Sequence, residues 1–165
     1  MIRDAELEDA PDLARVHVSS WQRAYVGLID QAFLDAMSVE SRIERWNLLL
    51  GQDRTRVLVV EAEGSVVGFC SLGLDDRQGW GEIYAIYVAP ERWGAGLGRE
   101  LLAAGETALS AAGHERAALW VLEGNLRARM FYERQGWVSA KPVRLENIGG
   151  SPVTEIRYEK HLGPR

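Results

Sequence analysis

Residues Gly81–Ala104 read GEIYAIYVAPERWGAGLGRELLAA, and the interpretation of the whole chain starts from this stretch. An apolar run typical of a β-strand, Ile83–Val88, is followed by a turn at Pro90, a glycine cluster and a helix with regularly spaced leucines. Glycines let consecutive backbone N–H groups point at one spot, and the helix N-terminus adds a partial positive charge. The stretch therefore predicts a binding site for a phosphate or pyrophosphate group.

Two common phosphate-binding motifs do not fit this loop. A P-loop places Lys and then Ser or Thr after its last glycine, whereas Arg99 and Glu100 follow Gly98 here. A dinucleotide fingerprint reads Gly-x-Gly-x-x-Gly and needs an acidic strand end about twenty residues later. This loop reads Gly-x-Gly-x-Gly, and no clear acidic strand end follows it.

The loop instead resembles the signature of the GNAT superfamily, the acyl-CoA-dependent N-acyltransferases. That signature is Gln or Arg, two further residues, and Gly-x-Gly or Gly-x-Ala, after a strand that ends in a pair such as Tyr-Val. Here Tyr87 and Val88 end the strand, and Gly96 and Gly98 take the last two positions. The Gln or Arg position falls on Trp93. This departure changes a side-chain contact but keeps the backbone N–H groups of the loop.

A second segment resembles the same family. Residues 125–137 read NLRARMFYERQGW, and the family segment is Asn-x-x-Ala-x-x-Phe-Tyr-x-x-x-Gly-Phe. Only the closing position differs, because Trp137 replaces the final Phe. Two segments in the family's order and spacing make the resemblance firm over about residues 57–137.

The order of the expected elements predicts one α+β domain over residues 1–165. In chain order they are a strand over 1–5, helices over 9–25 and 31–50 with a break near 37–38, β runs over 55–62, 66–74 and 81–88, a helix that stops at Gly113, a strand over 117–122, a helix over 125–135 and an antiparallel pair over 137–145 and 153–162. Asp9 and Ser38 are the expected helix caps, and Glu63-Gly64-Ser65 predicts a hairpin. We expect a central mixed, mostly antiparallel sheet of six to seven strands flanked by about four helices. The resemblance to the GNAT fold implies a splayed parallel strand pair that holds acyl-CoA.

Composition limits the possible classes of protein. The chain is 47% apolar and 26% charged, as soluble globular proteins are. No apolar run approaches the roughly 20 residues of a membrane helix, and the acidic N-terminus is unlike a signal peptide, so we expect a cytoplasmic protein without a membrane partner. The net charge of −5 argues against nucleic acid as a partner. A single cysteine, Cys70, excludes an internal disulfide and a cysteine-rich metal site, and no metal is expected.

The resemblance implies transfer of an acetyl group from acetyl-CoA to an amine by direct attack in a ternary complex. The loop would bind the CoA pyrophosphate, and the strand end would bind the pantetheine arm. A backbone N–H near Val88 would polarise the thioester carbonyl as an oxyanion hole does. The residues that the resemblance assigns to the cofactor are Ile86, Tyr87, Val88, Trp93, Gly94, Ala95, Gly96, Leu97, Gly98, Arg99, Asn125 and Tyr132. Asn125 can bind the pantetheine arm, cap its helix, or do both.

Two residues are the candidates for proton transfer. By the resemblance, Tyr132 is the general acid that protonates the leaving thiolate; the alternative is a tyrosine that only packs under the helix. Glu82 lies eleven residues before Trp93, where several family members carry a glutamate base, and is the candidate general base. The alternative is a solvated residue at a strand start. Asp75 and Asp76 are weaker candidates, because turn aspartates usually only form turns.

Other reactive side chains receive structural roles. Cys70 occupies an apolar strand position, where a free cysteine usually serves as a small hydrophobic residue rather than as a nucleophile. The three histidines show no metal-ligand spacing and no obvious catalytic triad, so they are expected to be structural or to face solvent.

The acceptor side is expected at Trp21, Tyr25 and Phe33, because the first two helices of this fold and their connection cover the substrate. An aromatic pair four residues apart on a helix also fits a hydrophobic core. The acceptor is either a small primary amine, which predicts a closed pocket, or a protein or peptide amine, which predicts an open groove. A longer acyl donor and a non-catalytic acyl-CoA-binding module remain alternatives, although Tyr132 and Asn125 argue against the latter. By analogy with relatives that dimerise, a homodimer is expected.

Overall fold

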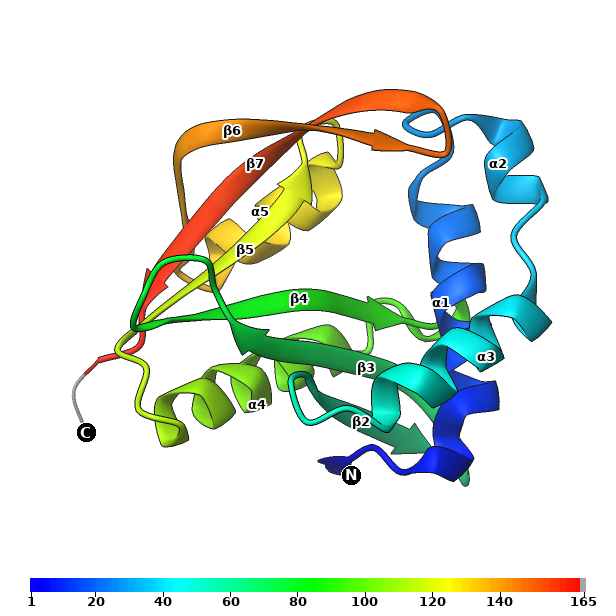
Figure 1. The fold of residues 1–165 in the computed structure, drawn as a ribbon, viewed down its shortest axis with the longest axis horizontal. Helices are drawn as coiled ribbons and strands as arrows, with labels where there is room; N and C mark the ends of the chain where they lie inside the picture. The colour runs from blue at the N-terminus through cyan, green and yellow to red at the C-terminus, as the bar shows by residue number, and fades with distance from the viewer. Residues whose placement is uncertain (164–165) are drawn as a thin grey trace.

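The computed structural model describes residues 1–163, which fold around a seven-stranded sheet in the order β1-β2-β3-β4-β5-β7-β6 (Figure 1). Neighbouring strands run antiparallel except for the parallel pair β4–β5. The strands are β1 (Ile2–Asp4), β2 (Arg56–Ala62), β3 (Ser65–Leu74), β4 (Trp80–Val88), β5 (Arg116–Leu122), β6 (Val138–Ile148) and β7 (Ser151–His161). The helices are α1 (Ala10–Ala24), α2 (Gln31–Asp35), α3 (Val39–Leu50), α4 (Leu97–Ala111) and α5 (Leu126–Arg134), with short 3-10 turns at Leu7–Asp9 and Pro90–Arg92. The predicted mixed, mostly antiparallel α+β fold is confirmed.

Helices cover both faces of the sheet, and alternating strand residues separate the two layers. In β2, Leu58 and Val60 face α4, whose Leu101 and Leu109 fill the larger core. The intervening Val59 packs instead with residues of α1 and α3. This alternation is the period of two expected for a strand buried on both faces. Within residues 1–163, no helix has both the length and the apolar character needed to cross a membrane.

Two predicted local features are confirmed by backbone geometry and hydrogen bonds. The hairpin between β2 and β3 turns through Glu63 and Gly64, whose φ angles are 54° and 80°, as a two-residue type I′ loop requires. At the start of α3, the Ser38 hydroxyl accepts a 3.2 Å hydrogen bond from the Ser41 N–H and caps the helix.

The predicted cap at Asp9 is wrong. Asp9 has helical backbone angles and makes no capping hydrogen bond to α1. Its carboxylate accepts hydrogen bonds from the Arg3 guanidinium at 2.8 and 2.9 Å and from the Glu6 N–H at 2.7 Å. The hydrogen bonds from Arg3 hold the pKa of this carboxyl below its usual value. Asp9 therefore joins β1 and the turn before α1 to the beginning of that helix.

The parallel pair β4–β5 separates soon after it begins, as Figure 1 shows. Pairing extends only from Trp80 opposite Arg116 to Ile83 opposite Leu119. At the same point β4 carries a bulge against β3, so that Tyr84 is the extra residue. Because a bulge changes which side chains share a face, residues 83 and 86 both face α4, whereas residue 85 faces α1 and α3. The predicted splayed parallel pair is confirmed.

His17 is held in an aromatic environment on the α1 side of the sheet. Its ring lies 5.4 Å from Trp21, 6.1 Å from Phe69 and 5.7 Å from Tyr87, measured between ring centroids. Within the described residues neither ring nitrogen has a hydrogen-bond partner. Burial, followed by the nearby positive charges of α3, lowers the pKa of His17 to about 3. The folded protein therefore keeps this imidazole neutral.

We expect His17 to make the protein less stable as the pH falls from about 6.5 toward 3. The unfolded chain takes up a proton in this range and the folded protein does not, so the contribution of His17 falls by about 1.4 kcal/mol per pH unit. Urea unfolding of the wild type and of His17→Phe at several pH values measures this difference. The curve of His17→Phe should be flatter, and the exposed control His161→Phe should follow the wild type. Parallel curves for wild type and His17→Phe would contradict the assignment.

Candidate active site

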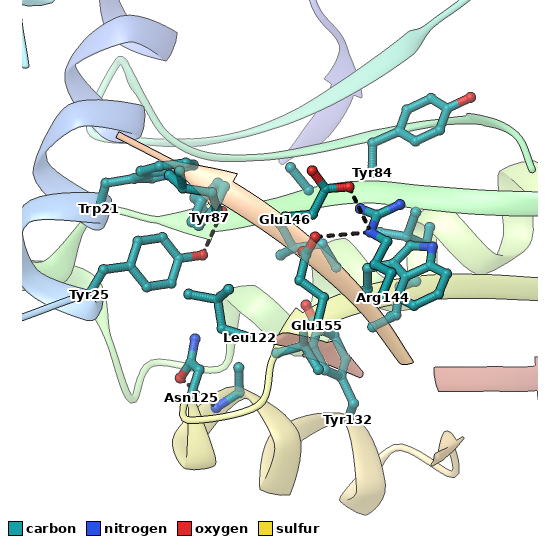
Figure 2. A pocket seen from close by; sticks show the side chains of 18 residues that line it. Trp21, Tyr25, Tyr84, Tyr87, Leu122, Asn125, Tyr132, Arg144, Glu146 and Glu155 are labelled. Atoms are coloured by element: carbon teal, nitrogen blue, oxygen red, sulfur yellow. Dashed lines mark hydrogen bonds and ion pairs between the residues drawn. The ribbon is translucent and has the colours of Figure 1, made fainter. Parts of the chain in front are cut away.

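The separated ends of β4 and β5 open into a cavity of about 380 Å³ (Figure 2). Its walls come from α1, β4, β5, α5 and the β6–β7 hairpin. Among the predicted site residues, the cavity brings together Trp21, Tyr25, Ile86, Tyr87, Asn125 and Tyr132. Residues from both ends of the chain thus meet at the point where strand pairing stops.

The α5 wall presents Asn125 and Tyr132 to the cavity, as Figure 2 shows. The two residues are about two helical turns apart and therefore share a face. Asn125 Oδ1 accepts a 3.2 Å hydrogen bond from the Ala128 N–H, so the predicted helix cap is confirmed. Burial raises the pKa of the Tyr132 hydroxyl well above its ordinary value. Tyr132 is therefore protonated at neutral pH and can donate a proton into the cavity.

The end of β4 presents backbone groups to the gap. The Ala89 N–H donates to Val67 O on the β3 side at 2.8 Å. Because successive N–H groups of a strand point to opposite edges, the Val88 N–H points toward the gap, where pairing with β5 has already ended. The Val88 carbonyl accepts hydrogen bonds from Ser20 Oγ at 3.1 Å and from Trp93 Nε1 at 2.7 Å. The Val88 N–H is therefore the backbone group that can bind a ligand in the gap.

The glycine loop after β4 has the backbone conformation that the sequence predicts. Gly94 and Gly96 have φ angles of 85° and 86°, and a Cβ at either position would meet nothing within 4 Å, so they are needed for conformation rather than for space. The Trp93 indole is turned back onto β4, and the Arg127 guanidinium lies 3.8 Å from the centroid of its ring. Trp93 therefore places an arginine of α5 beside the loop, where the family signature has a Gln or Arg.

The α1 wall carries two of the three predicted acceptor residues. Tyr25 and Tyr87 join their hydroxyl groups in a 2.8 Å hydrogen bond, and the ring of Trp21 stands edge-on to Tyr25 at 5.0 Å. The side chain of Tyr87 therefore faces α1 while its backbone belongs to the β4 wall.

The third predicted acceptor residue, Phe33, does not itself line the cavity. Its ring packs on Gly149 in the β6–β7 turn, where an added Cβ would lie 2.2 Å from the ring. Nearby, the Asp30 N–H donates to Ser151 Oγ at 3.0 Å, and Leu28 packs on Gly124 so tightly that an added Cβ would lie 2.6 Å from Leu28 Cδ2. The connection after α1 is thus held against the β6–β7 hairpin and the turn before α5, but none of residues 26–33 lines the cavity.

Glu82 lies next to the cavity but does not line it. It stands opposite Gly73 and Ala118 in the paired part of the sheet. Burial, and then the negative charge of Asp75, raise the pKa of Glu82 to about 7. The carboxylate of Asp75 is itself buried in a two-point ion pair with Arg157 at 2.9 and 3.1 Å, so Asp75 has a structural role. Asp76 is exposed outside the cavity.

Three charged cavity residues were missed by sequence reasoning, namely Arg144, Glu146 and Glu155. Arg144 Nε donates to Glu155 at 2.9 Å and lies 3.6 Å from Glu146, while its guanidinium lies 4.3 Å from the Trp120 ring centroid (Figure 2). They belong to β6 and β7, where charged residues alternate with others as on any solvated strand. Only the pairing of β7 with β5 brings them to the cavity.

We expect the Tyr25–Tyr87 hydrogen bond to show in a double-mutant cycle. Tyr25→Phe or Tyr87→Phe alone leaves one buried hydroxyl without its partner and should cost about 1–2 kcal/mol of unfolding free energy. The double variant should cost less than the sum of the two single variants. Urea unfolding measures all four proteins, and Tyr84→Phe, whose exposed hydroxyl donates to Leu74 O, is the control. Strictly additive losses would contradict the coupling.

Comparison with known proteins agrees with this geometry. Residues 16–137 match the Acetyltransferase (GNAT) family. The chain is 38% identical over 128 residues to the uncharacterised N-acetyltransferase YuaI of Bacillus subtilis, covering 75% of this chain and 72% of that protein. It is 35% identical over 158 residues to an uncharacterised N-acetyltransferase of Archaeoglobus fulgidus, covering 91% and 97%. Among solved structures, the PaiA N-acetyltransferase of Thermoplasma acidophilum in complex with coenzyme A superposes with a TM-score of 0.76 over 98% of both chains, at 22% identity.

Proposed function

The chain belongs to the GNAT acetyltransferase family, and from this we propose that it transfers an acetyl group from acetyl-CoA to the primary amine of a small molecule. The two substrates would react directly in a ternary complex. The observation that carries the proposal is the cavity, in which the strand gap and Tyr132 meet Trp21 and Tyr25 at the end of α1. We further propose that one domain spans residues 1–165 and works in the cytoplasm.

The donor would bind across the gap between β4 and β5. The loop over residues 93–99 would bind the pyrophosphate through its N–H groups and the start of α4. The arm would follow the unpaired edge of Ile86–Val88 and reach Asn125. Two observations support this placement: the Val88 N–H is left unpaired by β5, and a structure of this fold contains coenzyme A.

The reaction needs one bond formed, one broken and two proton transfers. The amine nitrogen attacks the thioester carbonyl carbon, and the Val88 N–H stabilises the resulting oxyanion. The C–S bond then breaks, and Tyr132 donates its proton to the sulfur. The proton lost by the amine would pass through water to Glu82, because that carboxylate does not line the cavity. Its pKa of about 7 suits a base at neutral pH.

We propose a small acceptor rather than a protein acceptor because the connection after α1 is tied to the β6–β7 hairpin. Phe33 on Gly149 and the Asp30–Ser151 hydrogen bond make this tie, which would narrow the approach of an extended peptide to the cavity. The direct test is CoA release from acetyl-CoA with polyamines, aminoglycosides, amino acids and short peptides. A preference for small amines supports the proposal, and transfer confined to peptides would contradict it.

Tyr132→Phe should reduce turnover by roughly 10²-fold or more, because the thiolate then leaves without a proton donor. The affinity for acetyl-CoA, measured by calorimetry, should stay nearly unchanged. Tyr84→Phe removes an exposed hydroxyl that donates to Leu74 O and points away from the cavity (Figure 2), and it serves as the control. An unchanged rate in Tyr132→Phe would remove this residue from the mechanism.

Glu82→Gln should alter the pH dependence of kcat/KM. In the wild type the rate should rise through about pH 7 as the carboxyl loses its proton. The variant should lose this rise and keep only the increase at higher pH that comes from the acceptor amine itself. Asp76→Asn, in the exposed turn nearby, should keep this rise but move it toward lower pH, because the charge of Asp76 contributes to the raised pKa of Glu82. Identical profiles for Glu82→Gln and wild type would give Glu82 a structural role only.

A further inference from the structure

On the acceptor side of the cavity, the carboxylate of Glu155 is more buried than the guanidinium of Arg144. The Glu155 side chain is 14% exposed, and the Arg144 side chain is 41% exposed. The charge of Glu155 also reaches Tyr25 and Tyr87, whose pKa values are raised by burial first and by this charge in addition. Glu155 therefore lies on the inner side, toward the strand gap, and Arg144 lies nearer to solvent.

Arg144 is fixed in place but keeps part of its hydrogen-bonding capacity. Its Nε donates to Glu155, and its flat face lies against Trp120. Within residues 1–163, no hydrogen bond uses its two terminal nitrogens. A guanidinium held in this way can bind a planar anion with two parallel hydrogen bonds at little cost in side-chain entropy.

We propose that the acceptor is a small amine that also carries an anionic group, a carboxylate or a phosphate, a few covalent bonds from the reacting nitrogen. The amino group of the acceptor would donate a hydrogen bond to Glu155 on the inner side, beside the thioester. The anionic group would bind the terminal nitrogens of Arg144. The short separation follows from the direct contact of 2.9 Å between the two side chains. This inference rests on the proposed acetyl transfer and specifies its acceptor.

The neighbouring charges agree with a ligand that carries both signs. Arg144, Glu146 and Glu155 are the charged residues that line the cavity, and together they carry a net charge of −1. Glu146 is 46% exposed and lies on the Nε side of Arg144, so it leaves the terminal nitrogens available. Arg157 is engaged with Asp75 and Glu159 outside the cavity. A zwitterion satisfies both Glu155 and Arg144, whereas a simple amine satisfies only Glu155.

The test compares acceptors that differ only in the anionic group. Rates of CoA release are measured for a panel of amino acids, their amides and the corresponding decarboxylated amines, and for O-phosphoethanolamine against ethanolamine. The anionic members should have kcat/KM values about 10-fold or more above their neutral counterparts, as charge-assisted hydrogen bonds allow. The two series distinguish a carboxylate from a phosphate. Amides and simple amines acetylated as well as the acids would overturn the inference and leave the acetyltransferase proposal standing.

Two arginine variants make the test specific. Arg144→Met should raise KM for the preferred anionic acceptor about 10-fold or more relative to its effect on the neutral counterpart. Arg77→Met is the matched control, because Arg77 likewise stacks on a tryptophan, Trp80, and pairs with a β7 glutamate, Glu159, but lies outside the cavity. Equal losses for all acceptors in Arg144→Met would overturn the inference.

A binding measurement separates the inference from the proposed reaction. If no member of the panel is acetylated, calorimetric titration of the enzyme–CoA complex with the same amino acids tests whether the proposed anion site exists. Binding that disappears in Arg144→Met supports the anion site while contradicting the acetyl transfer. The absence of binding overturns the inference.

Discussion

The early end of pairing between β4 and β5 is the constraint on which the rest of the site depends. Backbone groups left without a strand partner must find other partners or remain open to a ligand. The Val88 carbonyl accepts hydrogen bonds from Ser20 of α1 and from Trp93 of the glycine loop, so Val88 connects this helix and this loop to the end of β4. The bulge at Tyr84 changes the face of the following residues at the same point. The gap, the loop and the helices around it are therefore parts of one arrangement.

A second arrangement holds charged side chains of β6 and β7 against two tryptophans. The Arg157 guanidinium lies 5.3 Å from the ring centroid of Trp80 and 5.6 Å from that of Trp120, and it forms the buried pair with Asp75. The Arg144 guanidinium lies 4.3 Å from the ring centroid of Trp120. Stacking of this kind holds guanidinium groups in fixed positions without using all of their N–H donors. The same network places a negative charge near Glu82, which helps to explain why that carboxyl is a weak acid.

Much of the fold could be predicted because its signals are local. The Glu63-Gly64 turn, the Ser38 cap and the Asn125 cap each depend on residues within four positions. The conformation of the glycine loop and the placement of Asn125 and Tyr132 on the cavity could be predicted for the same reason, since the loop and α5 are continuous segments. The cavity wall built by β6 and β7 depends on long-range pairing, so Arg144, Glu146 and Glu155 were missed. The bulge in β4 had no sequence signal, and register relative to β3 decides which side chains enter the cavity.

The position of β7 between β5 and β6 has a consequence for how the protein is made. β5 is a central strand, but its partner on one edge is the last strand of the described chain, which pairs along the whole of β5 from Arg116 to Leu122. On the ribosome, the gap, the loop and α5 emerge before this partner exists. The nascent chain therefore exposes an unpaired edge of a buried strand, the kind of surface on which chaperones act and aggregation begins. Synthesis therefore delivers the strand gap, the loop and α5 first, and the sheet closes when β7 pairs with β5.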